Sequence, residues 1–80
     1  NNTLALGDKA LTGPVVRGDV ATLRGHLDAI ADPMIAETYR ALASATVGRA
    51  EALGEVNEQT ARELRDVINP AVEFLSEVNR

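Results

Sequence analysis

The sequence predicts an all-α fold of three to four helices, and three observations support this. Asp and Asn residues that suit a helix N-terminus recur along the chain, twice followed by Pro. The apolar residues after each of them keep the three- and four-residue spacings of one helix face, and no stretch keeps the alternation typical of a strand. Hydrophobic residues make up 45% of the 80 residues but aromatic residues only 2%. This composition suits a single domain, residues 1–80, with a core of closely packed aliphatic side chains.

The first part of the chain, residues 1–19, is predicted to lead into a helix. Residues 1–11 are expected to form the frayed end of a helix or a short turn of one. Residues 12–19, Thr-Gly-Pro-Val-Val-Arg-Gly-Asp, are predicted to be an ordered loop. Pro14 biases Gly13 away from the helical conformation, and the two glycines permit unusual backbone angles. Asp19 then suits the N-cap of the next helix, because its carboxylate can accept from the free amides of the first turn.

The helix that Asp19 opens is predicted to run to about residue 31. Its expected buried face, chosen by spacing, consists of Val20, Leu23, Leu27 and Ile30. Arg24, His26 and Asp28 lie toward the other face.

A long second helix is predicted from Pro33 to about residue 53. Asp32 is the N-cap, Pro33 suits the first helical position, and Gly54 suits the position after the helix end. The expected buried stripe consists of Ile35, Tyr39, Leu42, Thr46, Ala50 and Leu53. Small residues flank it and would allow close approach of another helix: Ala41, Ala43, Ser44, Ala45 and Gly48.

A third helix is predicted from Glu58 to about Ile68, with Asn57 as its N-cap. Ala61, Leu64 and Val67 or Ile68 are expected to turn inward. Asn69 and Pro70 end this helix and start a short fourth one that runs to the chain end and buries Phe74 or Leu75 and Val78.

Composition also excludes several classes of function. The formal net charge is -4 and the basic residues are scattered singly, so a nucleic-acid partner is not expected. No apolar run approaches the roughly 20 residues of a membrane span, and no membrane partner is expected. The chain has no cysteine, and its His, Asp and Glu residues lack metal-ligand spacing, so no metal site is predicted. We expect a cytoplasmic protein.

Residues 12–19 contain the only concentrated signal for chemistry. A glycine-rich turn at a helix N-terminus presents backbone amides that suit a carboxylate or phosphate, and Arg17 can add a charged, bidentate contact. The alternative is that the glycines and Pro14 serve only the geometry of helix entry, and on the residues alone such loops are common. His26, the only histidine, is a weak candidate for a general acid or base. A lone histidine on a helix is more often a surface or interface residue, and Tyr39 is more often a packing residue.

Residues 10–27 read A-L-T-G-P-V-V-R-G-D-V-A-T-L-R-G-H-L. This run resembles the signature of a bacterial family of Rossmann-like plus DUF2520 proteins, whose typical run is A-L-T-G-P-x-x-R-G-D followed by a T and by H-L on the next helix. The similarity continues at residues 39–43, Y-R-A-L-A, which resemble the family's Y-R-x-L-A. It covers about residues 10–50, and the last thirty residues match no motif of the family.

The resemblance implies a two-domain protein: an N-terminal Rossmann domain that binds NAD or NADP, and a helical domain like the C-terminal halves of 6-phosphogluconate dehydrogenase, ketopantoate reductase and pyrroline-5-carboxylate reductase. This chain would be part of the second domain. It would bind a small anionic substrate and form a homodimer, but bind no cofactor and have no activity alone. The implied site residues are Thr12, Gly13, Arg17, Gly18, Asp19 and Thr22, with His26 as the weak catalytic candidate.

A second hypothesis is a stand-alone helical module for oligomerisation or protein interaction, suggested by the small size and the Ala-rich second helix. The two hypotheses differ in what precedes residue 1. The oxidoreductase requires an upstream strand, a G-x-G-x-x-G/A run and a helix, whereas the module requires none of these. Both predict self-association through the helix that begins at Pro33.

Overall fold

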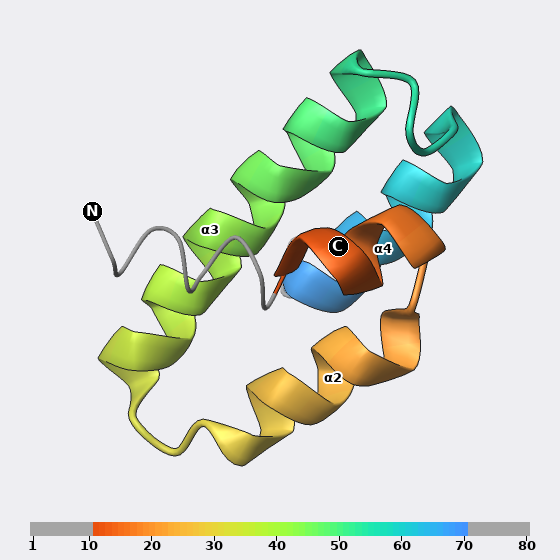
Figure 1. The fold of residues 1–80 in the computed structure, drawn as a ribbon. Helices are drawn as coiled ribbons and strands as arrows, with labels where there is room; N and C mark the ends of the chain where they lie inside the picture. Colours follow the sequence, from red (N-terminus) through yellow and green to blue (C-terminus); the bar gives the residue numbers. More distant parts are fainter. Residues whose placement is uncertain (1–10, 71–80) are drawn as a thin grey trace, which may run out of the picture.

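The computed structural model describes residues 11–70 of the chain, and these residues contain helices and no strand. A helical segment at residues 11–17 is followed by α2 (Val20–Ala29), α3 (Pro33–Ala52) and α4 (Glu58–Ile68). The all-α prediction is therefore confirmed. Figure 1 shows α2 and α3 joined at one end by a short connection, and α4 packs against both of them.

The core is aliphatic and draws on every helical segment that the structure describes. Its buried members are Leu11, Val15, Leu23, Ala43, Val47, Ala50, Val56, Ala61, Leu64 and Ile68. Val20, Tyr39 and Val67 pack against this cluster while partly exposed. α4 supplies three side chains that are fully buried or nearly so, and this is consistent with its place between the other two helices.

The helix starts follow the sequence prediction. Asp19 accepts a hydrogen bond from the Thr22 amide, Asp32 from the Met34 amide and Asn57 from the Thr60 amide, at 3.1, 2.9 and 2.7 Å. Each cap satisfies one of the backbone N–H groups that have no partner inside the helix.

The end of α3 also follows the prediction. Gly54 has a φ of +77°, and Glu55 donates its N–H to the Ala50 carbonyl at 2.8 Å, so Gly54 ends the helix from the left-handed region. α2 ends slightly earlier than expected, at Ala29, because the backbone of Ile30 is already extended, with φ -87° and ψ 109°.

The predicted loop at residues 12–19 is wrong for most of its length, because residues 11–17 are helical. Leu11 and Val15 are four residues apart and both buried, so they lie on the same face of this helix. Burial of this pair in the common core outweighs the low helix propensity of Gly13 and Pro14.

Gly18 ends this first helix. Its φ is +66°, its N–H donates to the Val15 carbonyl at 3.0 Å, and the Asp19 N–H donates to the Pro14 carbonyl at 2.8 Å. These two bonds form a Schellman motif, in which a glycine in the left-handed region closes the last turn. The unusual backbone angle expected of Gly18 is therefore present, but at a helix end rather than within a loop.

The predicted buried face of α3 is also wrong in part. Ala36, Ala43, Val47 and Ala50 are buried, whereas Ile35, Leu42 and Leu53 are 57%, 38% and 66% exposed. Ala50 and the partly buried Tyr39 are shared by the prediction and the structure. The small side chains face α4 because they allow its backbone to approach closely, and the helix is therefore rotated so that the larger ones face away.

In α4 the prediction is confirmed, since Ala61, Leu64 and Ile68 are fully buried and Val67 is half-buried. The predicted fourth helix, with Phe74, Leu75 and Val78, lies outside the described residues, as do residues 1–10. Within residues 11–70, no helix combines the length and the hydrophobicity that crossing a bilayer requires.

Candidate functional site

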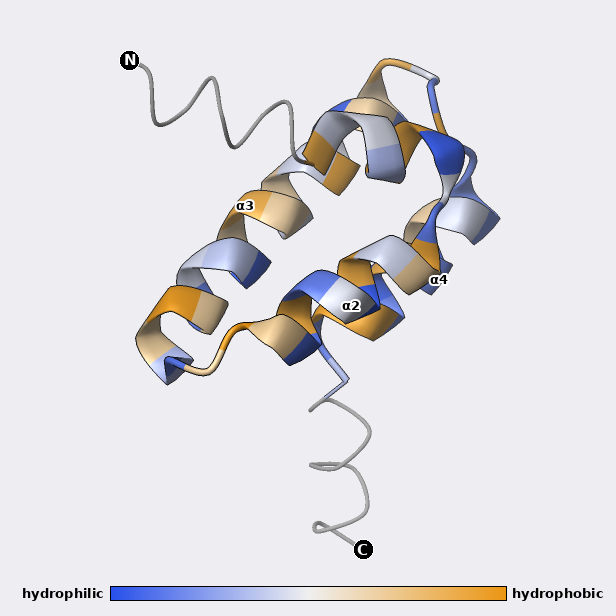
Figure 2. Ribbon diagram, turned by 60° about the horizontal axis from the view of Figure 1, so that its bottom comes forward, coloured by the Kyte–Doolittle hydropathy of each residue, from blue (hydrophilic) through white to orange (hydrophobic). Residues whose placement is uncertain are grey.

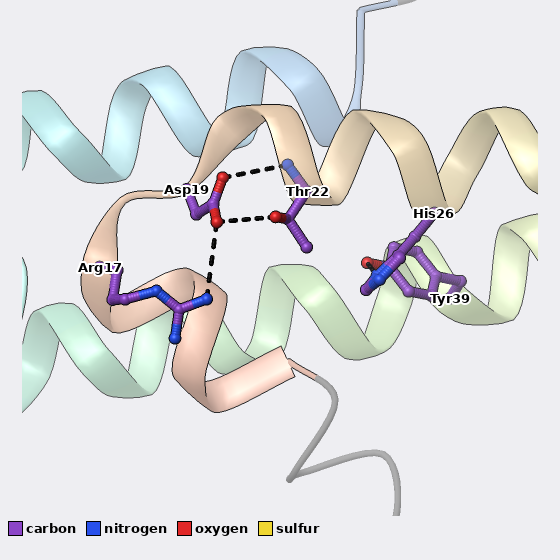
Figure 3. A network of polar contacts seen from close by, with 5 residues as sticks. All are labelled: Arg17, Asp19, Thr22, His26 and Tyr39. Carbon is purple, nitrogen blue, oxygen red and sulfur yellow. Dashed lines mark hydrogen bonds and ion pairs between the residues drawn. The ribbon is translucent and has the colours of Figure 1, made fainter.

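Asp19 lies at the centre of the residues singled out from the sequence (Figure 3). Its Oδ1 accepts from the Thr22 backbone N–H at 3.1 Å, and its Oδ2 accepts from the Thr22 hydroxyl at 2.7 Å. The Arg17 guanidinium lies 3.5 Å from Oδ2. The two hydrogen bonds from Thr22, and to a smaller extent Arg17, lower the pKa of Asp19 below its usual value. The structure thus brings Arg17, Gly18, Asp19 and Thr22 together at the junction of the first helix and α2, which we call the Asp19 turn.

Gly13, in the first helix, and Gly18, in this turn, make room for particular neighbours. A Cβ at Gly13 would lie 3.1 Å from Nη1 of Arg17, so the Arg17 side chain folds back over the preceding helical turn. A Cβ at Gly18 would lie 3.0 Å from Cγ2 of Thr60, so the turn packs closely against α4. Gly13 and Gly18 therefore have structural roles that do not require a ligand.

Most backbone amides of the turn are already bonded within the chain. Gly18 and Asp19 donate to carbonyls of the first helix, Val20 donates to the Gly18 carbonyl at 3.0 Å, and Thr22 donates to Asp19. The anion at the N-terminus of α2 is thus the carboxylate of Asp19 itself. The Arg17 side chain, 63% exposed, remains accessible to an external anion. Its assignment to a substrate carboxylate stays a prediction, as does that of Thr12, which is half-buried in the first helix.

His26 lies further along α2 and joins it to α3. Its Nδ1 is 2.8 Å from the hydroxyl of Tyr39, and the two rings meet edge to face with centroids 5.8 Å apart (Figure 3). Burial raises the pKa of the Tyr39 phenol above its usual value. His26 follows Asp19 by seven positions, which corresponds to roughly 10 Å along the helix axis. His26 and the Asp19 turn are therefore separate features of one helix.

Sequence reasoning did not find the pairing of His26 with Tyr39. The partners are 13 residues apart and belong to different helices, so no local spacing indicates the contact. A hydrogen-bonded Tyr–His pair can transfer a proton between its members. Among residues 11–70, no group of three or more His, Cys, Asp or Glu side chains is arranged to hold a metal ion.

A family described as a domain of unknown function, DUF2520, matches residues 1–46. That match covers more than half of the 80 residues. The chain belongs to the DUF2520 family. No curated protein and no solved structure matches this DUF2520 chain significantly. The matched residues include the Asp19 turn, all of α2 and the part of α3 that holds Tyr39, whereas α4 lies beyond them.

Proposed function

We propose that this DUF2520 chain is the C-terminal substrate-binding and dimerisation domain of an NAD(P)-dependent oxidoreductase. The observation that carries the proposal is the family match over residues 1–46, because it contains the run A-L-T-G-P-V-V-R-G-D and the turn built on it. NAD or NADP would be held by a Rossmann domain upstream. Residues 11–70 contain no strand and therefore no strand–turn–helix unit for a dinucleotide. The helical domain supplies position and electrostatics, and has no activity alone.

Arg17 is the residue of this domain that we assign to the substrate. Its guanidinium is exposed, stands at the N-terminal end of α2 and is held over Gly13 by its ion pair with Asp19. A guanidinium presents five N–H donors, so pairing with one carboxylate oxygen leaves donors for a second carboxylate or a phosphate. The substrate class is accordingly a small anion. The His26–Tyr39 pair is the candidate proton donor or acceptor. The assignment of His26 to catalysis is weaker than that of Arg17 to substrate binding.

The dimerisation part of the proposal is supported by the outward face of α3. Met34, Ile35, Leu42 and Leu53 are 78%, 57%, 38% and 66% exposed, and apolar residues recur along the whole helix (Figure 2). A helix that is apolar on both sides is expected to be covered on both sides. A second copy packed antiparallel suits this face, since Met34 of one α3 then lies near Leu53 of the other, with Leu42 close to the two-fold axis at mid-helix. Such self-complementarity is the requirement of a symmetric dimer.

The reading frame upstream of residue 1 tests the proposal directly. A strand, a G-x-G-x-x-G/A run and a helix should precede the helical domain, and the full-length protein should quench or shift NADPH fluorescence on binding. An upstream region without this unit, together with no NADPH binding, would refute the oxidoreductase.

The second candidate is a stand-alone helical oligomerisation module, and the exposed apolar face of α3 is the observation that favours it. It differs from the first in needing no nucleotide domain. A short frame that starts shortly before residue 1, with a product that self-associates, would support the module.

A further inference from the structure

Arg40 lies where α2, α3 and α4 converge, and it borders two hollows. The larger, of about 450 Å³, is lined by Glu37, Arg40, Ala41, Ser44, Asn69 and Pro70. The smaller, of about 240 Å³, adjoins it at Arg40 and Pro70 and includes Arg24, Asp28 and Asp66 in its wall. The larger hollow is within the size range of small-molecule sites. Neither contains the Asp19 turn or the His26–Tyr39 pair.

The charged groups of the larger hollow are not paired within the part of the chain that the structure describes. Arg17, Arg62 and Arg65 each lie within 3.5 Å of a carboxylate. Arg40 is half-buried, yet across residues 11–70 it makes neither a hydrogen bond nor an ion pair. Glu37, three residues earlier on α3, is also without a partner in this range. The two side chains are thus neighbours of opposite charge that form no ion pair with each other.

Charge balance favours one class of ligand over the others. A simple anion would be attracted by Arg40, but Glu37 and, in the adjoining hollow, Asp28 and Asp66 would repel it. A simple cation would be attracted by these carboxylates but repelled by Arg40 and Arg24. A zwitterion can place a carboxylate on the guanidinium and an ammonium on Glu37, since residues three apart on a helix have Cβ atoms about 5 to 6 Å from each other. Ser44 and Asn69, whose side chains are 3.4 Å apart, supply neutral polar groups in the same wall.

We propose that this hollow binds a small zwitterion of the amino-acid type, with its carboxylate on Arg40 and its ammonium on Glu37. The carboxylate gains the bidentate, charge-assisted contact that a guanidinium offers. The site is distinct from the Asp19 turn and does not depend on the nucleotide domain, so its failure would leave the proposed oxidoreductase standing.

The test uses the ¹⁵N-labelled 80-residue chain and three probes at matched ionic strength: L-alanine as the minimal chiral zwitterion, acetate as its anionic half and methylammonium as its cationic half. L-Alanine should cause saturable shifts of the Asn69 side-chain amide and the Arg40 Nε–H, with weaker effects from either half. Arg40→Gln should raise the Kd for L-alanine about tenfold or more. Arg62→Gln is the control, because Arg62 is exposed and lies outside both hollows. It should leave the Kd for L-alanine unchanged.

Glu37→Gln gives an independent check, because Glu37 is exposed and its replacement should leave the fold intact even if Arg40→Gln does not fold. It should remove the preference for L-alanine over acetate while leaving acetate binding unchanged or stronger. The proposal is overturned if L-alanine gives no saturable shift, if folded Arg40→Gln binds it as the wild type does, or if Glu37→Gln keeps the preference.

Discussion

Asp19 holds Thr22 with both carboxylate oxygens, one on the backbone N–H at 3.1 Å and the other on the side-chain hydroxyl at 2.7 Å. The N–H of the same Asp19 donates to the Pro14 carbonyl at 2.8 Å. One residue therefore closes the first helix and opens α2, and the two helices meet without a flexible linker. The run R-G-D-V-A-T is, in physical terms, a helix end joined directly to a helix start.

Replacing Asp19 should have a pH-dependent effect on stability. Asp19→Ala removes the N-cap and should lower the Tm by about 4 to 8 °C at neutral pH. Hydrogen bonds from Thr22 lower the folded pKa of Asp19 below 3.8. The contribution is therefore fully present above that value and is lost as the pH falls through the folded pKa. Thermal melts at decreasing pH should show the curves of wild type and variant converging.

Asp19→Asn is the control for this experiment, since it keeps a capping oxygen but cannot titrate. It should remain close to the wild type at neutral pH. A deficit of Asp19→Ala that stays constant down to strongly acid pH would contradict the assigned role.

Gly18 should tolerate alanine less well than Gly54, the other glycine with a positive φ within residues 11–70. The left-handed backbone angle, φ +66°, costs an alanine roughly 1 to 2 kcal/mol. The added Cβ would also lie 3.0 Å from Thr60 Cγ2. Gly54→Ala, at φ +77° but facing open space, should show the backbone cost alone. Chemical denaturation of both variants should find Gly18→Ala the less stable.

Thr60→Ser separates the two causes, and Gly25→Ala is the reference for a glycine with neither the backbone cost nor the contact. Thr60→Ser removes Cγ2 and should reduce the excess cost of Gly18→Ala over Gly54→Ala. Gly25→Ala, within α2 and with nothing within 4 Å of its added Cβ, should stabilise the domain by about 0.5 to 1 kcal/mol. Equal destabilisation by Gly18→Ala and Gly54→Ala would show that the contact with Thr60 has no energetic weight.

Tyr39→Phe should cost about 0.5 to 1.5 kcal/mol, because it removes the hydrogen bond to His26 and keeps the ring. Tyr39 is the only tyrosine and the chain has no tryptophan, so phenolate absorbance reports on this side chain alone. The titration midpoint should lie above 10.0. Since the folded state holds the phenol proton more tightly, stability should fall as the pH rises from the unfolded pKa through the folded one. Tyr39→Phe should lack this fall, and a midpoint at or below the ordinary value would contradict the burial of the phenol.

Arg17→Ala should separate a substrate contact from a structural one. In the proposed two-domain oxidoreductase it should weaken binding of a carboxylate- or phosphate-bearing substrate by ~1.5 to 3 kcal/mol. Its Tm should hardly change, because an exposed ion pair contributes little to stability. Arg62→Ala is a matched control, since Arg62 has the same 3.5 Å separation from its carboxylate and a similar exposure, 64%. Lost stability with unchanged substrate affinity would assign Arg17 to the Asp19 ion pair alone.

Leu42→Glu should dissociate the expected dimer. Leu42 is 38% exposed near the middle of α3, and a symmetric antiparallel pair would bring two glutamates together there. Val16→Glu is the control, because Val16 is 39% exposed but lies on the first helix. Sedimentation should find a dimer for the wild type and for Val16→Glu and a monomer for Leu42→Glu. A folded wild-type monomer at high micromolar concentration would contradict self-association.

The sequence by itself determined the fold class and the helix starts. Asp19, Asp32 and Asn57 cap the helices as predicted, and Gly54 ends α3, because caps and left-handed helix ends depend on bonds that span only a few residues. The same locality brings Arg17, Gly18, Asp19 and Thr22 together, so this part of the candidate site could be predicted as a group. The helix at residues 11–17 could not be predicted in this way, since the burial of Leu11 and Val15 depends on partners that are distant in the sequence.

Only the tertiary structure decided which way α3 faces and what His26 contacts. α3 carries apolar residues on two sides, so its sequence is compatible with burial of either, and local spacing does not choose between them. In the packed structure α3 buries Ala43, Val47 and Ala50 and leaves Leu42 exposed. That rotation of α3, together with the packing of α2 against α4, places Tyr39 opposite His26. Such contacts are set by the distance between helix axes, a property of the packed helices that no single helix encodes.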